Sequence, residues 1–213
     1  MDMDIVGRIN AVHRELGTRN IPAGEGKVVV LRRSYDADIE DVWDACTDPE
    51  RIARWFLPVT GDLKLGGTYQ LKGNAGGEIV GCEPPRLLKV TWVYGENATE
   101  KDVGEVTVRL SPGEDGATVL ELEHAAVVDP GFWGEFGPGA VGVGWDGALL
   151  GLDVYLGGGT LDGEAWPTSP EGREFATRSS EAWGVAHAAS GAPADEVAAA
   201  VENTTKAYAP PPA

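Results

Sequence analysis

The chain has 213 residues, of which 42% are hydrophobic, and its 34 acidic against 17 basic residues give a formal net charge of −17. This length suits one domain with an extension, and the apolar fraction can build a core, which excludes a wholly disordered chain. The charge argues against a nucleic-acid partner, which needs a basic face, and equally against binding to an anionic membrane surface.

Cysteine usage and the N-terminal residues predict the compartment. Cys46 and Cys82 are too few for a disulfide framework and suit core positions in a reducing environment. Residues 1–16 begin with acids and hold no long apolar run, unlike a signal peptide. The sequence has no apolar stretch of about 18 residues, so no transmembrane helix is predicted. We therefore expect a cytoplasmic protein.

The start of the chain predicts a helix and then a strand. Helical spacing over residues 3–16 places four apolar side chains on one face: Ile5, Ile9, Val12 and Leu16. A proline and two glycines within residues 21–26 end this helix. Residues 27–35 are dense in β-branched side chains and predict the first strand.

Two helices should follow this strand. Asp38 is a plausible N-cap for a helix over residues 38–46, which has further acids in its first turn. Asp48 and Pro49 then start a short second helix over residues 49–55, because an N-cap followed by proline at the first helical position is a typical helix start.

From residue 57 to residue 125 the pattern predicts short strands separated by turns. These strands are expected over residues 68–72, 78–82, 87–94, 102–110 and 117–125. Their spacing favours an antiparallel meander over a parallel sheet. The period of two places one set of side chains on the inner face: Tyr69, Leu71, Leu88, Val90, Trp92, Tyr94, Val106, Val108, Leu110, Thr118, Leu120, Leu122 and His124. Glu121 and Glu123 fall on the opposite face and should meet water.

Residues 141–156 lie between two glycine-rich breakers and predict a long helix. Its apolar face comprises Val141, Trp145, Ala148, Leu149, Leu152 and Leu156, with Asp146 and Asp153 on the other side. Its four internal glycines each lose about 1 kcal/mol against alanine. Such a helix needs a broad surface to lie on, which the sheet could supply, and its glycines would allow close approach.

The segments around this helix have weaker signals. Residues 127–139 predict an aromatic loop that acts either as a lid over the helix start or as a plug that seals the core. After the long helix, a linker, two helices and a proline-rich tail are expected at residues 157–170, 171–190, 194–207 and 210–212. His13 and His187 fall on predicted terminal helices and are expected at the surface.

A strongly twisted antiparallel sheet curls, and one straight helix cannot fill its concave side. Six aromatic residues would border the resulting gap: Trp55, Phe56, Tyr69, Trp92, Tyr94 and Trp145. The alternative is that these rings pack into a closed core, as aromatic residues on inner faces usually do. The residues by themselves leave both interpretations open.

Several motifs resemble those of one known family. Residues 42–55 match "V-W-x-A-x-T-D-P-x-x-x-x-x-W", residues 61–69 match "G-D-x-x-x-G-G-x-Y/F", and residues 77–92 match "G-x-I-x-x-x-x-P-P-x-x-L-x-x-T-W". Residues 118–124 match "T-x-L-x-L-x-H", and a "G-W" pair at 144–145 opens the last helix. The chain resembles the SRPBCC superfamily (START, Bet v 1, polyketide cyclase), and within it the branch named after Hsp90 ATPase activator homologue 1.

The resemblance implies an α+β helix-grip fold, in which a curved antiparallel sheet wraps around a long C-terminal helix and encloses a hydrophobic cavity. It assigns residues 27–158 to this domain. Residues 1–26 are then an N-terminal helix and linker, and residues 159–213 a linker and helical extension. This extension could pack on the sheet, close the cavity mouth or build a homodimer.

Three functions follow, in order of preference. The first is binding of a small hydrophobic or aromatic molecule, with ten contact residues: Trp55, Phe56, Tyr69, Trp92, Tyr94, Leu120, Leu122, His124, Trp145 and Leu149. The second is a cyclase or dehydratase-type enzyme in the same cavity, with His124 as the candidate acid–base group. The third is a co-chaperone-like interaction protein, which only the family label suggests.

Other chemistry has less support in the sequence. The alternative role for His124 is a hydrogen-bonded histidine at a strand end. The scattered histidines and cysteines lack the spacing of metal ligands, so neither a metal nor a cofactor is predicted.

Overall fold

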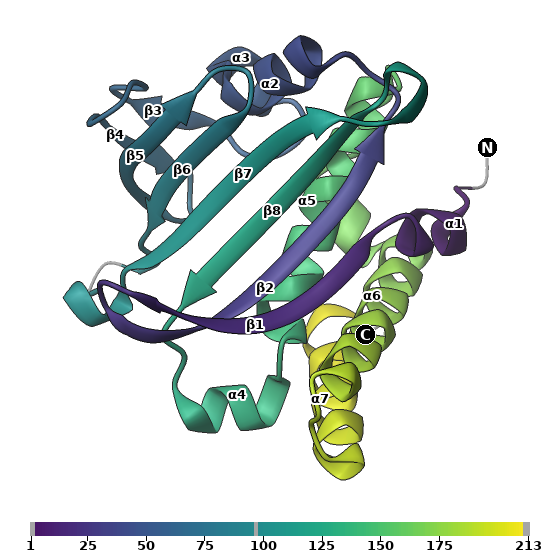
Figure 1. Cartoon of the computed structure of the whole chain (residues 1–213). Helices are drawn as coiled ribbons and strands as arrows, with labels where there is room; N and C mark the ends of the chain where they lie inside the picture. The colour runs from purple at the N-terminus through teal and green to yellow at the C-terminus, as the bar shows by residue number, and fades with distance from the viewer. Residues whose placement is uncertain (1–2, 96–97, 211–213) are drawn as a thin grey trace.

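The structure, a computed structural model, describes residues 3–95 and 98–210. One antiparallel sheet in the order β1-β2-β8-β7-β6-β5-β4-β3 curves around a long helix, α5 (Figure 1). The strands are β1 His13–Ile21, β2 Gly24–Tyr35, β3 Val59–Gly61, β4 Thr68–Leu71, β5 Gly76–Glu83, β6 Leu87–Trp92, β7 Gly104–Pro112 and β8 Thr118–Ala126. The predicted α+β class and helix-grip arrangement are confirmed.

Helices cover both ends of the sheet and the outer side of α5. They are α1 Ile5–Asn10, α2 Ile39–Thr47, α3 Pro49–Ile52, α4 Pro130–Phe136, α5 Gly139–Leu156, α6 Pro170–Ala189 and α7 Ala194–Tyr208, with 3₁₀ turns at Glu100–Asp102, Glu114–Gly116 and Trp166–Thr168. Figure 1 shows α2 and α3 at one end of the sheet, α4 at the other, and α6 and α7 beside α5. None of the helices in the described part of the chain combines the length and hydropathy that crossing a bilayer would need.

The predicted helix over residues 3–16 is wrong beyond residue 10. Helix α1 is short, and β1 begins at His13. This strand pairs along its whole length with β2, where Leu16 lies opposite Val29. Pairing with a long neighbouring strand outweighs a helical period in so short a segment, because isolated helices of this length are marginal. The segment predicted as helix and linker therefore supplies an edge strand of the sheet.

The helix pair predicted after the first strand is confirmed, with small shifts at the ends. Helix α2 extends to Thr47, and α3 ends at Ile52 rather than at residue 55. The Asp48 carboxylate accepts two backbone N–H groups of α3, at 2.8 and 3.0 Å, as an N-cap should. Asp38 makes no such bond with its side chain.

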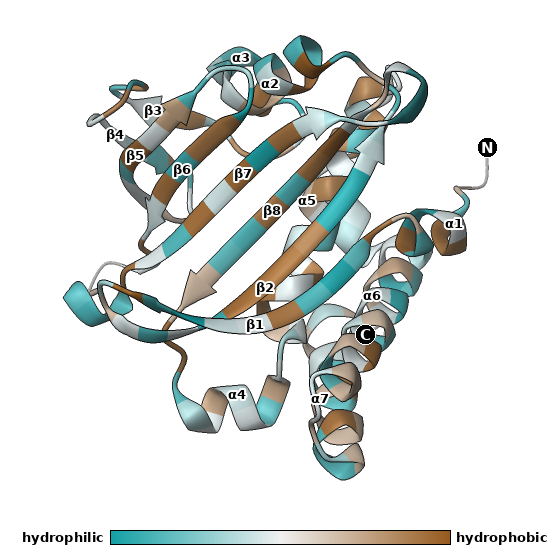
Figure 2. Ribbon diagram, in the orientation of Figure 1, coloured by the Kyte–Doolittle hydropathy of each residue, from teal (hydrophilic) through white to brown (hydrophobic). Residues whose placement is uncertain are grey.

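The strands alternate as predicted between an inner and an outer face, and Figure 2 shows this alternation along the sheet. Four residues of β8 are buried on the inner face: Thr118, Leu120, Leu122 and His124. Glu121 and Glu123 lie on the outer face, where they pair with Arg32 and Arg19 at 2.5 and 2.8 Å. Such partly exposed pairs add about 0–1 kcal/mol each, so the inner face dominates the stability.

Helix α5 is buried on two sides, and its glycines explain how. A Cβ added to Gly142 would lie 2.2 Å from the Trp183 ring of α6. One added to Gly151 would lie 2.5 Å from the backbone oxygen of Trp55. The predicted close approach is therefore confirmed at two positions, whereas a Cβ on Gly147 would meet nothing within 4 Å.

A buried ion pair joins α5 to the N-terminal and C-terminal segments. Arg14 of β1 donates two hydrogen bonds to Asp146 of α5, both at 3.0 Å, and these side chains are 6% and 1% exposed. Asp146 also accepts from Ser179 Oγ at 2.5 Å and from Trp183 Nε1 at 3.0 Å. Burial raises the pKa of the Asp146 carboxyl, and the Arg14 guanidinium opposes that rise.

The C-terminal extension packs on α5, on the side away from the sheet. Helices α6 and α7 agree with the predicted spans to within two residues. His13 is exposed, as expected, but His187 is only 6% exposed. The expectation for His187 is wrong because Ala200 of α7 and the segment at Gly137 cover it. Of the proline-rich tail predicted at residues 210–212, residues 211 and 212 lie outside the described residues.

The aromatic loop predicted at residues 127–139 contains a short helix, α4. Asp129 caps it by accepting two backbone N–H groups, and Pro130 occupies its first turn. The prediction missed this helix because its apolar pattern is short and rich in glycine. Trp133 packs edge-on against His187 with ring centroids 6.0 Å apart, so α4 is fixed to the extension at one end of the sheet.

Candidate functional site

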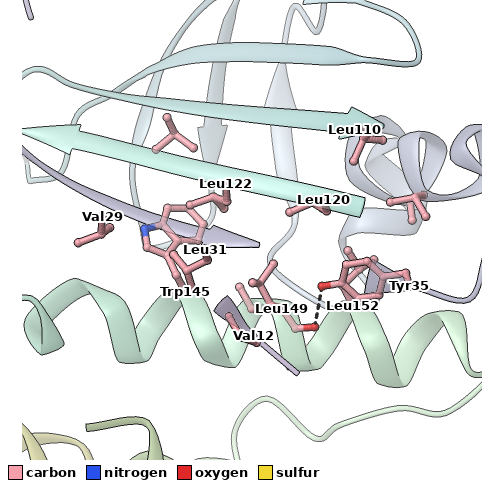
Figure 3. Packing of buried hydrophobic residues seen from close by; sticks show 14 of the residues in the cluster. Val12, Val29, Leu31, Tyr35, Leu110, Leu120, Leu122, Trp145, Leu149 and Leu152 are labelled. Carbon is pink, nitrogen blue, oxygen red and sulfur yellow. Dashed lines mark hydrogen bonds between the residues drawn. The ribbon is translucent and has the colours of Figure 1, made fainter. Parts of the chain in front are cut away.

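An apolar cavity of about 370 Å³ lies between α5 and the concave face of the sheet. The side chains of strands β4 to β8 form one wall, helix α5 forms another, and α2 and α3 close one end. Figure 3 shows Trp145 and Leu149 of α5 pointing toward Leu120 and Leu122 of β8. The helix therefore leaves space beneath the curve of the sheet, on the side where the sequence places the aromatic residues.

Eight of the ten predicted contact residues line this cavity: Trp55, Phe56, Tyr69, Trp92, Leu120, Leu122, Trp145 and Leu149. Tyr94 does not, because β6 ends at Trp92 and the Tyr94 side chain is 67% exposed. The alternation of strand faces ends with β6, so it does not place the side chain of Tyr94 on the inner face. His124 is buried beside the cavity but does not line it.

The aromatic lining residues form a continuous row of rings. The centroid of Phe56 lies 5.6 Å from that of Trp55 and 6.2 Å from that of Trp145, with both pairs inclined by 27°. Trp92 continues the row, 5.1 Å from Trp145 and 6.5 Å from Tyr69. These distances lie in the range for favourable aromatic contacts. The row offers ring faces and edges to a bound molecule.

Most polar atoms of this lining are already hydrogen-bonded to the protein. Trp55 Nε1 donates to the Ala45 carbonyl at 2.9 Å. The Tyr69 hydroxyl donates to the Thr91 carbonyl at 2.8 Å. Thr47 Oγ1 donates to a backbone carbonyl of its own helix at 2.8 Å. Most hydroxyl and indole donors of the lining are therefore hydrogen-bonded to carbonyl groups of the protein and are not available to a ligand.

Both cysteines of the chain are free and line the cavity. Burial raises the pKa of the Cys46 thiol to about 12, so it stays neutral. An irregular register between Ile79 and Gly81 lets Cys82 face the same side as Ile79, although the two residues are three positions apart in the strand. These thiols behave as apolar lining, as expected of core cysteines.

The cavity reaches solvent at the loop that joins β3 to β4, because this loop adds two exposed residues to the lining. Leu63 is 38% exposed, and the exposed Lys64 side chain pairs with Asp62 at 2.9 Å. Among the residues that the structure describes, Lys64 is the one charged residue that lines the cavity. The sequence did not predict that this loop lines the cavity. The loop is polar, and its place beside the cavity follows only from how the β3–β4 hairpin packs.

His124 makes a defined hydrogen bond to the cavity wall. Trp145 Nε1 donates to His124 Nδ1 at 3.0 Å, and the two rings are nearly perpendicular. Nδ1 is therefore an acceptor, which places the proton of the neutral ring on Nε2. Burial lowers the pKa of His124 to about 4, so the ring is neutral near pH 7. Its position is that of a hydrogen-bonded histidine that holds Trp145 in place.

The described residues contain no group of three or more His, Cys, Asp or Glu side chains that could hold a metal ion. Further residues line the cavity that the sequence placed on the inner face of the sheet or the apolar face of the long helix, but not among the ligand contacts. They are Leu71, Leu88, Val90, Val106, Val108, Ala148 and Leu152. Their period-two and helical signals were sufficient to find them. Ile52 and Pro84 had no such signal.

Comparison with solved structures finds two structures of the protein CalU16 from Micromonospora echinospora that are similar to this chain. The crystal structure is 41% identical, with a TM-score of 0.67 over 83% of this chain and 98% of that chain. The solution NMR structure is 42% identical, with a TM-score of 0.69 over 85% and 97%. DynU16, from the dynemicin biosynthetic locus, is 25% identical, with a TM-score of 0.54 over 62% and 48%.

A comparison with curated protein sequences finds no match. The family model described as "Activator of Hsp90 ATPase homolog 1-like protein" matches residues 36–157, which is more than half of the chain. This span begins after β2 and ends at the last turn of α5, so it contains most of the cavity wall. The chain belongs to the Activator of Hsp90 ATPase homolog 1-like family.

Proposed function

We propose that the protein binds a small, largely apolar molecule with aromatic character in the cavity between α5 and the sheet. The observation that carries this proposal is a cavity of about 370 Å³ whose lining includes one charged residue, Lys64, at its opening. Pockets that bury small ligands commonly have volumes of about 300–1,000 Å³ and mostly apolar walls. A cavity of this size and composition favours an apolar occupant over a polar one.

The row of rings from Trp55 to Tyr69 supports an aromatic ligand in particular. Offset or tilted contacts between aromatic rings add about 0.5–1.5 kcal/mol each beyond the burial of area. Burying about 200 Å² of apolar ligand surface adds roughly 5 kcal/mol before the costs of association. The indole N–H of Trp92 has no acceptor among the described residues, and a ligand carbonyl or ether oxygen could use it.

The alternative of a cyclase or dehydratase has weaker support. Such chemistry needs acid–base groups that converge on the substrate. Tyr69 and Thr47 already donate to backbone carbonyls, and His124 lies behind Trp145. DynU16 belongs to a biosynthetic locus, which is compatible with either a binding or a catalytic role for this chain. A co-chaperone role rests on the family description alone.

Titration with N-phenyl-1-naphthylamine, a neutral aromatic fluorophore, tests the proposal. Ala148 lines the cavity from α5, so Ala148→Phe would fill part of it. Ala188, an exposed residue of α6, provides the matched control Ala188→Phe. Both variants are first checked for folding by far-ultraviolet circular dichroism and thermal unfolding, because overpacking can itself destabilise by about 1–3 kcal/mol.

We expect saturable fluorescence enhancement for the wild type and for Ala188→Phe, with similar Kd values. Ala148→Phe should weaken binding at least about tenfold while remaining folded, since each 1.4 kcal/mol of lost interaction corresponds to a factor of ten. The proposal is wrong if the wild type shows no saturable binding, or if a folded Ala148→Phe binds as tightly as the control.

A further inference from the structure

Residues 49–57, which comprise α3 and the stretch that leads to β3, cover one end of the cavity between α5 and the sheet. We call these residues the α3 segment. Ile52, Trp55 and Phe56 line the cavity, so two members of the row of aromatic rings belong to this segment. Figure 1 shows α3 beside α2 at one end of the sheet. A molecule bound in the cavity would therefore touch the α3 segment directly.

The backbone of the α3 segment is bonded only to itself and to its capping residue. In the part of the chain that the structure describes, and apart from bonds within α3 itself, its N–H groups donate to the carbonyls of Asp48, Arg51 and Ile52 at 2.9 to 3.3 Å. The first backbone hydrogen bond to another element lies just beyond the segment, from Lys72 to the Pro58 carbonyl at 2.9 Å. No residue of the segment is buried. Such local bonding and exposure are typical of parts of a protein that open at a low cost in free energy.

The other walls of the cavity are anchored more firmly. Strands β4 to β8 are paired in the sheet, helix α5 is buried on two sides, and α2 buries Val42 and Ala45. Even the exposed β3–β4 loop is attached to β5, because the Gly66 N–H donates to the Ile79 carbonyl at 2.8 Å and the Gly67 carbonyl accepts from the Ile79 N–H at 2.9 Å. The α3 segment, by contrast, can move away without breaking a backbone bond to another element.

The Arg51 side chain joins the α3 segment to the helices on either side. Its Nη2 lies 2.8 Å from the Asp41 carboxylate of α2, and its Nε donates to the Tyr155 hydroxyl of α5 at 3.0 Å. The side chains of Arg51 and Asp41 are 26% and 50% exposed, so water competes for both of them. Trp55 Nε1 adds one hydrogen bond, to the Ala45 carbonyl of α2 at 2.9 Å. Besides apolar packing, the segment is therefore held by polar contacts that can break and form again.

We infer that the α3 segment is a lid that opens to admit a ligand and closes over it, with Arg51 as the latch that holds the lid shut. The ligand rests on the function proposed above, whereas the opening is a property of the free protein. Opening separates Arg51 from Asp41 and Tyr155 and separates Trp55 from Ala45, while the pairing of the sheet stays intact. Closing completes the row of aromatic rings over the bound molecule.

A lid controls the rates of binding and release more than the affinity. If the ligand passes only through the open form, the association rate constant is proportional to the open fraction of the free protein, and the dissociation rate constant to the open fraction of the complex. A weaker latch raises both fractions by the same factor, so Kd stays nearly constant. Damage to the cavity wall instead raises the dissociation rate constant and Kd together, as substitutions in binding sites usually do.

Stopped-flow fluorescence with N-phenyl-1-naphthylamine measures both rate constants on the full-length protein. Arg51→Met removes both polar contacts of the latch, and Tyr155→Phe removes one of them. The matched control is Arg54→Met, because Arg54 is an exposed arginine of the same segment without an ion pair to the described residues. All variants are first checked for folding by circular dichroism and thermal unfolding.

We expect Arg51→Met to raise both rate constants at least about threefold and to change Kd by less than about twofold, since partly exposed pairs are weak and are lost equally from the free protein and the complex. Tyr155→Phe should raise both rate constants by a smaller factor. Arg54→Met should leave the two rate constants and Kd unchanged.

The reaction of Cys46 with 4,4′-dithiodipyridine tests the lid without a ligand. Cys46 is a free thiol of α2 that lines the cavity, so its reaction rate reports how often the cavity opens, and mass spectrometry distinguishes it from Cys82. The Arg51 guanidinium lowers the pKa of Cys46 against the effect of burial, so loss of this charge alone would slow the reaction. We expect Arg51→Met to speed it at least about twofold, and Tyr155→Phe, which keeps the charge, to speed it as well.

The inference is overturned if Arg51→Met leaves the association rate constant or the Cys46 reaction rate unchanged, or if Arg54→Met raises them equally. A rise in the dissociation rate constant and Kd alone also overturns it, because Arg51 would then only support the wall. Failure of the proposed function is distinguishable from failure of the lid. If the wild type does not bind the probe, the thiol reaction of the free protein still decides whether the α3 segment opens.

Discussion

The substitution Gly142→Ala should destabilise the protein, although alanine is the better helix former. Gly142 lies in the middle of the first half of α5, where a Cβ would stand 2.2, 2.4 and 2.5 Å from three atoms of the Trp183 indole. No rotation of a small group can relieve these contacts, since Trp183 is 1% exposed and its Nε1 donates to Asp146. The indole must move, and its hydrogen bond to Asp146 must lengthen or break.

The magnitude follows from opposing contributions. Replacing glycine by alanine within a helix gains about 1 kcal/mol. Overpacking a tight core costs about 1–3 kcal/mol, and loss of a buried hydrogen bond to a charged group costs about 1.5–3 kcal/mol. The net change for Gly142→Ala is a destabilisation of about 1.5–5 kcal/mol. Gly147→Ala in the same helix meets nothing within 4 Å and should gain up to about 1 kcal/mol.

Urea unfolding monitored by circular dichroism at 222 nm measures the free energies of unfolding of the wild type and both variants. We expect the free energies of unfolding of the two alanine variants to differ by about 1.5–6 kcal/mol, with Gly147→Ala at or above the wild type. The packing described for α5 and α6 is refuted if Gly142→Ala is as stable as Gly147→Ala. Because both substitutions make the same chemical change in one helix, helix propensity alone cannot produce the expected difference.

Two further predictions concern buried ionisable side chains, Asp146 and His124. Asp146→Asn should destabilise the protein by about 3–5 kcal/mol in the same urea assay, because it leaves Arg14 buried without a counter-charge; a loss below about 1 kcal/mol would contradict the ion pair. The pKa of His124 is about 4 when folded, against an ordinary value of 6.5, so the unfolded chain binds more protons between these values. Stability from this group should therefore fall by up to about 3 kcal/mol as the pH drops from about 6.5 to 4. His124→Gln should flatten the pH dependence of unfolding in that interval, and an unchanged profile would disprove the assignment.

The sequence was sufficient to predict most of the sheet because its strands alternate cleanly and its turns carry glycine. It failed at β1, where the apolar residues fit a helical period and the pairing with β2 is set by tertiary structure. It also failed at α4, whose seven residues are too few for a periodic signal. In both places the fold is determined by contacts with distant segments, which a local pattern does not record.

The candidate site was predictable to the extent that it follows from strand faces. Trp92 and Leu120 were correctly assigned by the period of two, whereas Tyr94 was not, because the pattern does not show where a strand ends. The roles of Asp146 and Arg14 could not be predicted, since their contact joins positions 132 residues apart. The sequence suggested His124 either as an acid–base group or as a hydrogen-bonded histidine at a strand end, and the structure shows the hydrogen bond, from Trp145.

The claim that an apolar ligand occupies the cavity between α5 and the sheet is tested most directly by the indole N–H signals of the tryptophans. In a ¹H–¹⁵N titration with N-phenyl-1-naphthylamine, we predict that Trp55, Trp92 and Trp145 shift saturably with one common Kd. Trp183, on the opposite side of α5, should keep its position. If the three cavity signals stay unchanged at saturating probe, or if Trp183 shifts as much as they do, the account of the cavity as a ligand site is wrong.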